Sequence, residues 1–239
     1  MKIGILCEGE KTDAPVINTL LKHLFPSVEF FIRGKTKEAI FKAGDIELEK
    51  IFSEESVERA LIVWDLLPLG HQMGVSCQWS EKPSRSEQRQ MLLNLLCNSE
   101  HLSNSLKQQA LHLANRYKFV NCDVEHPNGK EDLFKLISVC YTCDGWLLSD
   151  GSVLKDLASS NSRQAERWNP PDPDRCQNPA GELKRYFGQG YNKRLKYFNK
   201  SDHNIVITEE YIKQGKVESM LNSSSFSRMI YAIKQWVQL

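Results

Sequence analysis

The chain begins with the stretch Lys2-Ile3-Gly4-Ile5-Leu6-Cys7-Glu8-Gly9-Glu10-Lys11-Thr12-Asp13. Its apolar run ends at Glu8, and an amphipathic run follows at once, with apolar side chains at Val16, Ile17, Leu20, Leu21 and Leu24. This pattern predicts a strand, a tight loop and a helix. In open α/β sheets such a loop lies beyond the carboxyl end of the strand, where ligands bind. The acidic residues of the loop are therefore candidate site residues.

A second apolar run, from Ala60 to Trp64, also ends on an acidic residue, Asp65. Two buried strands would then deliver carboxylates to the same edge of one sheet. Magnesium and manganese prefer oxygen ligands, and magnesium usually keeps several waters, so a few carboxylates suffice. The sequence therefore predicts a divalent-metal site with Glu8, Asp13 and Asp65 as its first ligands. From spacing alone, the plainer interpretation is that Asp13 only caps a helix and Asp65 only occupies a turn.

Further strands and helices alternate along the chain. Strands are predicted at 28–33, 60–64, 118–125 and 133–139, and helices at 35–52, 84–96, 102–117 and around 146–148. This alternation predicts an α/β fold with a mostly parallel sheet flanked by helices. A Ser-, Asn- and Pro-rich stretch follows residue 158, and the chain after it has a helical pattern. The expected organisation is an α/β domain at 1–158, a linker at 159–180 and a C-terminal helical, basic lobe at 181–239.

Composition narrows the possible classes of protein. The 239 residues are 41% hydrophobic and 26% charged, which is ordinary for a chain with a packed core. The formal net charge of +1 and the pI of about 7.6 exclude a polybasic nucleic-acid binder, so any nucleic-acid surface must be local. No apolar run approaches the roughly 20 residues that span a bilayer, and no signal-peptide pattern is present. A cytoplasmic protein without a membrane partner is expected.

The chain lacks the sequence motifs of nucleotide-driven motors, dinucleotide-binding proteins and serine hydrolases. The chain has no G-x-x-x-x-G-K-[ST], no G-x-G-x-x-G and no G-x-S-x-G motif. An ATPase, if one is involved, is therefore expected to be a separate polypeptide. The seven cysteines should mostly be free thiols. Cys140 and Cys143 form one C-x-x-C pair in an apolar run, which favours buried structural thiols, with metal or redox chemistry as the alternative.

One segment, Lys184 to Lys200, is basic and rich in aromatic residues. It contains no acidic residue, and its cations are Lys184, Arg185, Lys193, Arg194, Lys196 and Lys200. Cations that bind phosphates, together with rings that stack on bases, are what single-stranded or looped nucleic acid requires. The alternative is a solvated helix whose rings belong to the core.

The residues from Ile5 to Ile17 resemble the opening of Toprim domains, in which an apolar strand precedes E-G and then T-[DE]. Topoisomerases, primases and overcoming-lysogenisation-defect nucleases share that domain. The rest of the chain is similar to bacterial Toprim-like proteins that often occur in mobile or phage-defence contexts. Their E-A-W-L-L-A-D, N-P, G-Y-x-K and S-F-x-R motifs resemble Asp144–Asp150, Asn178-Pro179, Gly190–Lys193 and Ser225–Arg228.

The resemblance implies particular roles for the acidic residues. Glu8 takes the place of the glutamate that acts as metal ligand or general acid/base, and Asp65 takes the first place of a D-x-D pair. The second place is Leu67, which cannot bind a metal. A replacement ligand could come from Asp144, where relatives have glutamate, or from Asp123 or Glu125. For these last two residues an ordinary solvated strand end is the alternative.

The leading hypothesis is a magnesium- or manganese-dependent nuclease that acts on DNA or RNA in anti-phage defence. Glu8 and Asp65 are its expected catalytic residues, and Glu8, Asp13, Asp65 and Asp144 its expected metal ligands. The expected nucleic-acid contacts are Lys193, Arg228, Lys184, Arg185, Arg194 and Lys196. A second hypothesis is an inactive Toprim-like subunit that binds nucleic acid or partners in a defence complex. A third is phosphoryl transfer on a nucleotide or small phosphate ester. The metal hypothesis requires that the side chains of residues 8 and 65 converge rather than pair with nearby lysines or arginines.

Overall fold

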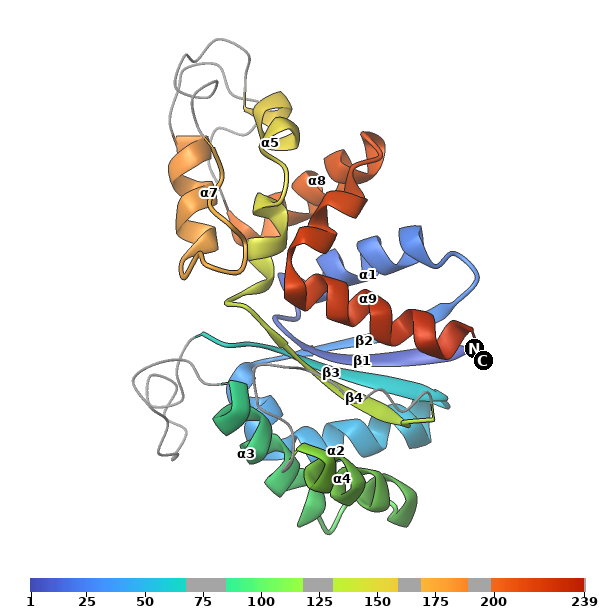
Figure 1. The fold of residues 1–239 in the computed structure, drawn as a ribbon. Coiled ribbons are helices and arrows are strands. Elements are labelled where there is room, and N and C mark those ends of the chain that lie inside the picture. The colour runs from blue at the N-terminus through green and yellow to red at the C-terminus, as the bar shows by residue number, and fades with distance from the viewer. Residues whose placement is uncertain (68–84, 118–130, 159–168, 189–198, 239) are drawn as a thin grey trace.

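A four-stranded, all-parallel sheet forms the centre of the computed structural model, which describes residues 1–67, 85–117, 131–158, 169–188 and 199–238 (Figure 1). The strand order is β2-β1-β3-β4. The strands are β1 (Lys2–Glu8), β2 (Glu29–Lys35), β3 (Arg59–Asp65) and β4 (Phe134–Val139). The expectation of an α/β fold with a parallel sheet is therefore confirmed. The strand predicted at 118–125 lies outside the described residues.

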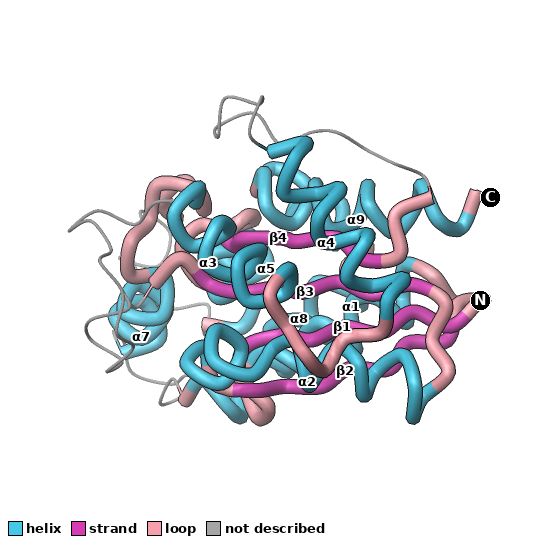
Figure 2. Tube along the Cα trace, turned by 90° about the horizontal axis from the view of Figure 1, so that it is seen from below, coloured by secondary structure: helices cyan, strands magenta, loops and turns pink. Residues whose placement is uncertain are grey.

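Helices cover both faces of the sheet (Figures 1 and 2). On one face lie α1 (Asp13–Leu24), α8 (Lys200–Lys213) and α9 (Ser224–Val237). On the other lie α2 (Lys37–Glu55), α3 (Arg85–Cys97) and α4 (Asn104–Tyr117). The shorter elements are η2 (Cys143–Leu148), α5 (Gly151–Leu157), α7 (Pro179–Gly188) and η3 (Val217–Asn222).

The alternation of side chains along each strand explains the two layers of helices. Successive residues of a strand point to opposite faces of its sheet. In β1, Ile3 and Ile5 join the core beneath α1, whereas Leu6 joins the core beneath α2. In β3, Leu61 and Val63 lie on the α1 side, and the side chains at Ala60, Ile62 and Trp64 lie on the other. Because both faces are buried, the strands read as continuous apolar runs.

The order of the strands places a switch point between β1 and β3. The chain leaves β1 through α1 to β2 on one side, and returns through α2 to β3 on the other. At such a point the connections leave in opposite directions, and a crevice opens beyond the carboxyl ends of the strands. Glu8 ends β1 and Asp65 ends β3. Both predicted carboxylates therefore lie at the place where open α/β sheets bind ligands.

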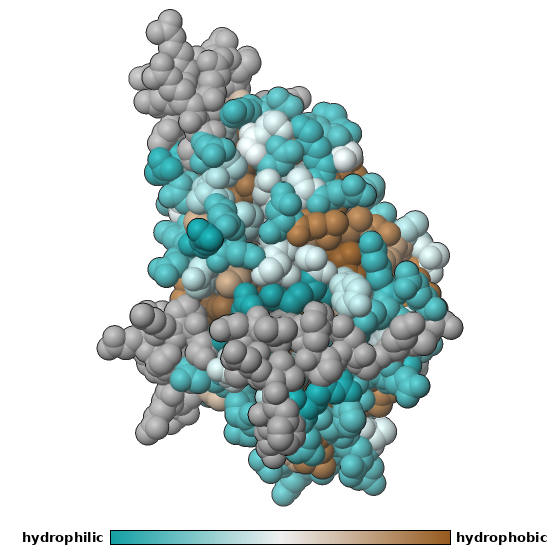
Figure 3. All heavy atoms as spheres, viewed as in Figure 1, coloured by the Kyte–Doolittle hydropathy of each residue, from teal (hydrophilic) through white to brown (hydrophobic). Residues whose placement is uncertain are grey.

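The C-terminal helices share a hydrophobic core with α1. α8 packs against α1, and α9 packs along β4. Figure 3 shows this side of the molecule as largely polar, with an apolar area near α1 and α9. The division of the chain at 158 and 180 stays a prediction. No helix among the described residues is both long and apolar enough to cross a membrane.

Candidate metal centre

The loop after β1 is held in a tight conformation that begins α1 at Asp13. Gly9 has a φ of 71°, and a Cβ atom there would lie 2.1 Å from Thr12 Oγ1. The amides of Asp13 and Ala14 both donate to the Gly9 carbonyl, at 3.0 Å each. Since only glycine adopts this conformation without strain, Gly9 lets the chain turn directly from strand to helix. Asp13 is thereby placed beside the carboxyl end of β1, with 2% of its surface exposed.

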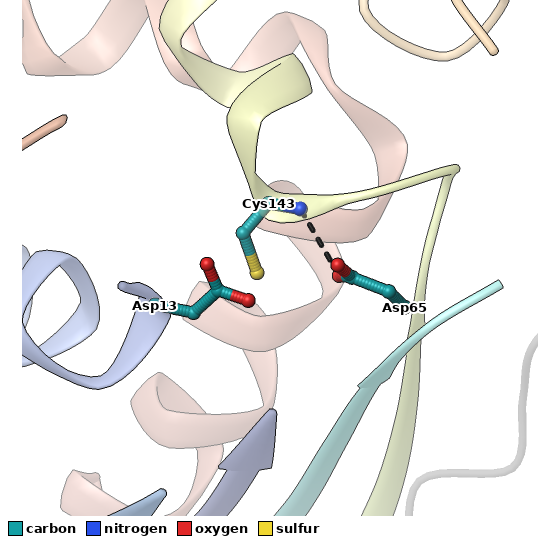
Figure 4. Close-up of side chains that lie close together, drawn as sticks. All are labelled: Asp13, Asp65 and Cys143. Atoms are coloured by element: carbon teal, nitrogen blue, oxygen red, sulfur yellow. Dashed lines mark hydrogen bonds between the residues drawn. The ribbon is translucent and has the colours of Figure 1, made fainter. Parts of the chain in front are cut away.

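The carboxylates of the sheet edge are connected through backbone amides. The amide of Asp65 donates to Glu8 Oε2 at 3.0 Å, and the amide of Cys143 donates to Asp65 Oδ1 at 3.0 Å. Figure 4 shows Asp13, Asp65 and Cys143 directed toward one another from α1, β3 and η2. One ligand atom from each of these three residues lies within 4.8 Å of the others. Asp13 and Asp65 therefore converge, and Glu8 is joined to this pair through the backbone amide of Asp65.

Asp144 brings a fourth carboxylate to the same place, and it is 1% exposed. Asn204 Nδ2 donates to Asp144 Oδ1 at 2.7 Å, and Thr142 Oγ1 donates to Asp144 Oδ2 at 3.2 Å. Lys200 Nζ lies 3.0 Å from Asp144 Oδ2 and 3.2 Å from Asp13 Oδ1. One ammonium group therefore links two of the four carboxylates.

The pKa values in this cluster are shifted by burial and by mutual repulsion. Burial raises the pKa of Glu8 to about 7, and Asp13 adds to the rise while Lys37 opposes it. Burial likewise raises the pKa of Asp13 to about 6, against the charge of Lys200. The pKa of Asp65 rises well above its usual range, first through burial and then through Asp13 and Glu8. Burial alone would lower the pKa of Lys200, but Asp144 and Asp13 raise it above its usual value. In the metal-free protein, burial and mutual repulsion therefore favour the protonated forms of these carboxyl groups.

We expect the metal-free protein to be more stable at pH 5.5 than at pH 8. A carboxyl group whose pKa is higher in the folded state stabilises that state while it is protonated, and the stabilisation is lost as the pH rises through the folded value. For Glu8 and Asp13 this window extends from the ordinary values of 4.5 and 3.8 to about 7 and about 6. Urea unfolding at the two pH values should differ by roughly 1–3 kcal/mol. The double variant Glu8→Gln/Asp13→Asn should lose most of this difference, and an unchanged difference in the variant would contradict the assignment.

A groove of about 920 Å³ opens beside Glu8. Its lining comes from the loop after β1, from the end of β2 and from the start of α2, and it includes Arg33, Lys35 and Lys37. Arg33 and Lys35 form ion pairs with Glu47, at 3.1 and 3.2 Å. The groove therefore offers open space next to a carboxylate of the cluster.

The predicted nucleic-acid contacts do not gather at this cluster in the described residues. Arg228 donates to Ser224 Oγ and to the Ser138 carbonyl, at 3.1 and 3.0 Å, and so ties α9 to β4. Arg185 pairs with Glu182 within α7 at 2.6 Å, and Lys184 is exposed on the same helix. The other predicted nucleic-acid contacts lie outside the described part of the chain: Lys193, Arg194 and Lys196. The same holds for Asp123 and Glu125, the two further candidates for a replacement metal ligand.

Three residues of the cluster were not among the predicted site residues: Cys143, Lys200 and Asn204. Cys143 was interpreted as a buried thiol, which it is, and burial and Asp65 raise its pKa well above the usual value. Lys200 and Asn204 are four residues apart on α8, so they share one face of the helix. Their polar character was visible in the sequence, but only the packing of α8 on α1 brings them to the cluster.

Fold and site together define the class: a doubly wound parallel α/β protein with buried carboxylates at its switch point. Comparisons with protein-family models, with curated proteins and with solved structures found no match. The function is therefore inferred from the residues of the cluster.

Proposed function

We propose that this protein is a magnesium- or manganese-dependent nuclease that hydrolyses phosphodiester bonds of DNA or RNA. The observation that carries the proposal is a group of four carboxylates, from Glu8, Asp13, Asp65 and Asp144, near the switch point of the sheet. Ligand atoms of Asp13, Asp65 and Cys143 lie within 4.8 Å of one another, Glu8 accepts from the Asp65 amide, and Lys200 joins Asp13 to Asp144. Four different segments supply them, and three of the four residues are nearly inaccessible to solvent. Burial of so many like charges is costly unless a cation or a proton compensates it.

The residues present suit a hard divalent cation. Carboxylate oxygens are the ligands that magnesium and manganese prefer, and Asp13 Oδ1 is buried without a well-aligned hydrogen bond. Asp13, Asp65 and Asp144 would hold the cation, and Glu8 would serve either as a further ligand or as the general base. When bound, it would neutralise charge on the scissile phosphate and lower the pKa of an attacking water.

Glu8 is suited to act as the general base. A base works best when its pKa lies near the working pH. Burial raises the pKa of Glu8 to about 7 in the metal-free protein, and a bound cation would lower it. Glu8 also lines the open groove, so a water molecule and a substrate can reach it from solvent. The amide of Asp65 fixes the orientation of the Glu8 carboxylate.

An inactive binding subunit is the second candidate, and one observation favours it. Lys200 lies between Asp13 and Asp144, where a lysine can replace a metal as the compensating charge. Leu67 at the expected second aspartate position agrees with this candidate. The resemblance to Toprim proteins supports a cytoplasmic role in anti-phage defence for either candidate, with a separate ATPase as a possible partner.

Incubation with plasmid, single-stranded DNA and tRNA tests the proposal directly. We expect cleavage of at least one of these substrates with manganese or magnesium, and none with EDTA. A panel of nucleotides and small phosphate esters should remain intact, which separates a nuclease from a general phosphoryl-transfer enzyme. Cleavage that persists in EDTA would end the metal-dependent proposal. No cleavage of any substrate, together with no manganese binding by calorimetry, would favour the inactive subunit.

A further inference from the structure

The ammonium group of Lys200 contacts two of the carboxylates that would hold a cation. Lys200 Nζ lies 3.2 Å from Asp13 Oδ1 and 3.0 Å from Asp144 Oδ2. Magnesium binds carboxylate oxygens at about 2.0–2.1 Å, so a cation on these oxygens would lie within roughly 5 Å of the ammonium. Two positive charges at that separation in a buried site repel strongly. The lysine and the metal therefore cannot both occupy these oxygens in the observed arrangement.

The backbone around Lys200 is fixed by contacts that do not involve its side chain. Asn204, one turn further along α8, donates to Asp144 Oδ1. The Tyr211 hydroxyl donates to the Leu147 carbonyl at 3.0 Å, which joins the other end of α8 to η2. The side chain of Asn199 caps the helix by accepting from the Ser201 amide at 3.2 Å. α8 can therefore stay in place while the lysine side chain moves.

The side chain of Lys200 also has a route out of the cluster. It is 32% exposed, whereas the side chains of Asp13 and Asp144 are 2% and 1% exposed. Its flexible four-carbon stem can carry the ammonium group into solvent without movement of the helix. The two carboxylates, in contrast, are almost completely buried.

We propose that Lys200 is a built-in competitor of the divalent cation: it compensates Asp13 and Asp144 in the metal-free protein and leaves when the metal binds. This inference rests on the proposed metal site and adds its regulation. The metal-free cluster is kept folded by an internal positive charge, and the metal must displace that charge before the site is complete. The affinity for metal is therefore lower than the four carboxylates alone would give.

Manganese titration of wild type and Lys200→Gln by calorimetry tests the competition. We expect the variant to bind manganese at least about tenfold more tightly, because no ammonium has to be displaced. Lys213→Gln is the matched control, since Lys213 lies on the same helix and pairs only with Glu210 among the ion pairs of the described residues. It should bind manganese as wild type does.

A second measurement uses the wild-type protein and does not depend on how the variant folds. Lys200 and Lys213 are labelled with an amine-reactive acetylating reagent, with and without manganese, and the modified peptides are quantified by mass spectrometry. Manganese should increase the labelling of Lys200 several-fold and leave Lys213 unchanged.

The outcomes separate this inference from the proposed function. Equal manganese affinity of wild type and Lys200→Gln, with unchanged labelling of Lys200, would overturn the competition and leave the metal site standing. Binding by the variant but not by wild type would support the competition and count against metal-dependent activity of the native protein. No binding by either protein would overturn both.

Discussion

Glu8→Gln and Asp65→Asn should each reduce manganese-dependent cleavage of nucleic acid by at least about 100-fold. Both substitutions remove a charge from the cluster while keeping an oxygen that can accept the amide hydrogen bond of Asp65 or Cys143. The structural contacts therefore survive, and the loss falls on metal binding and proton transfer. The measurement is the initial rate of cleavage over a series of manganese concentrations, with the affinity for manganese determined separately by calorimetry.

The stability of these variants distinguishes a functional residue from a structural one. Because burial raises the pKa values of Glu8 and Asp65, neutral amides should leave the metal-free protein at least as stable as wild type at pH 7.5. Loss of activity with retained or increased stability is typical of residues that serve function at the expense of the fold. Glu29→Gln is the control, since Glu29 is an exposed carboxylate at the opposite end of the sheet. Cleavage by either site variant at the wild-type rate would contradict the assignment.

Local sequence patterns predicted the two carboxylates that lie at the ends of sheet strands. Glu8 and Asp65 each follow a buried apolar run, and parallel strands bring such positions to one edge. Both strands lie within one or two residues of their predicted bounds. The turn at Gly9 could also be predicted from neighbouring residues, because a glycine between strand and helix permits the positive φ that is observed. Asp13, interpreted most plainly as a helix cap, is instead a buried carboxylate that follows the cap position at Thr12.

The remaining members of the cluster depend on packing that no local pattern encodes. Asp144 lies in η2, and it was proposed only from the resemblance to Toprim proteins. Lys200 and Asn204 reach the cluster because α8 packs on α1, and this contact joins segments far apart in sequence. Their charge and polarity were visible in the sequence, but their partners were not.

Leu67 occupies the position at which the resemblance to Toprim proteins implies a second aspartate. Its amide donates to the Tyr141 carbonyl at 3.2 Å, so the segment after β3 continues alongside the segment after β4. This pairing brings the start of η2, with Cys143 and Asp144, next to Asp65. The expected second aspartate is absent, yet Asp13 and Asp144 keep the cluster acidic.

Trp146→Ala should lower the free energy of unfolding by about 3–5 kcal/mol, a large part of the stability of an ordinary domain. Trp146 is completely buried in η2, its indole Nε1 donates to Ser225 Oγ at 3.0 Å, and its ring contacts Phe226 with centroids 5.2 Å apart. Removal of the ring leaves a cavity between η2 and α9 and takes one of two hydrogen-bond partners from Ser225 Oγ, which keeps Ser223 Oγ at 3.0 Å. The measurement is urea unfolding followed by far-ultraviolet circular dichroism.

The same substitution should also weaken manganese binding, because η2 carries Asp144 and the amide that orients Asp65. Trp146→Phe is the matched variant: it keeps most of the packed ring and loses the indole hydrogen bond, so it should cost only about 1–2 kcal/mol. If η2 is the element that joins the C-terminal helices to the metal site, the losses in stability and in manganese affinity should follow the same order, with alanine worse than phenylalanine. A Trp146→Ala protein that unfolds at the wild-type urea concentration, or that is destabilised but binds manganese with wild-type affinity, would show that η2 does not position the carboxylates.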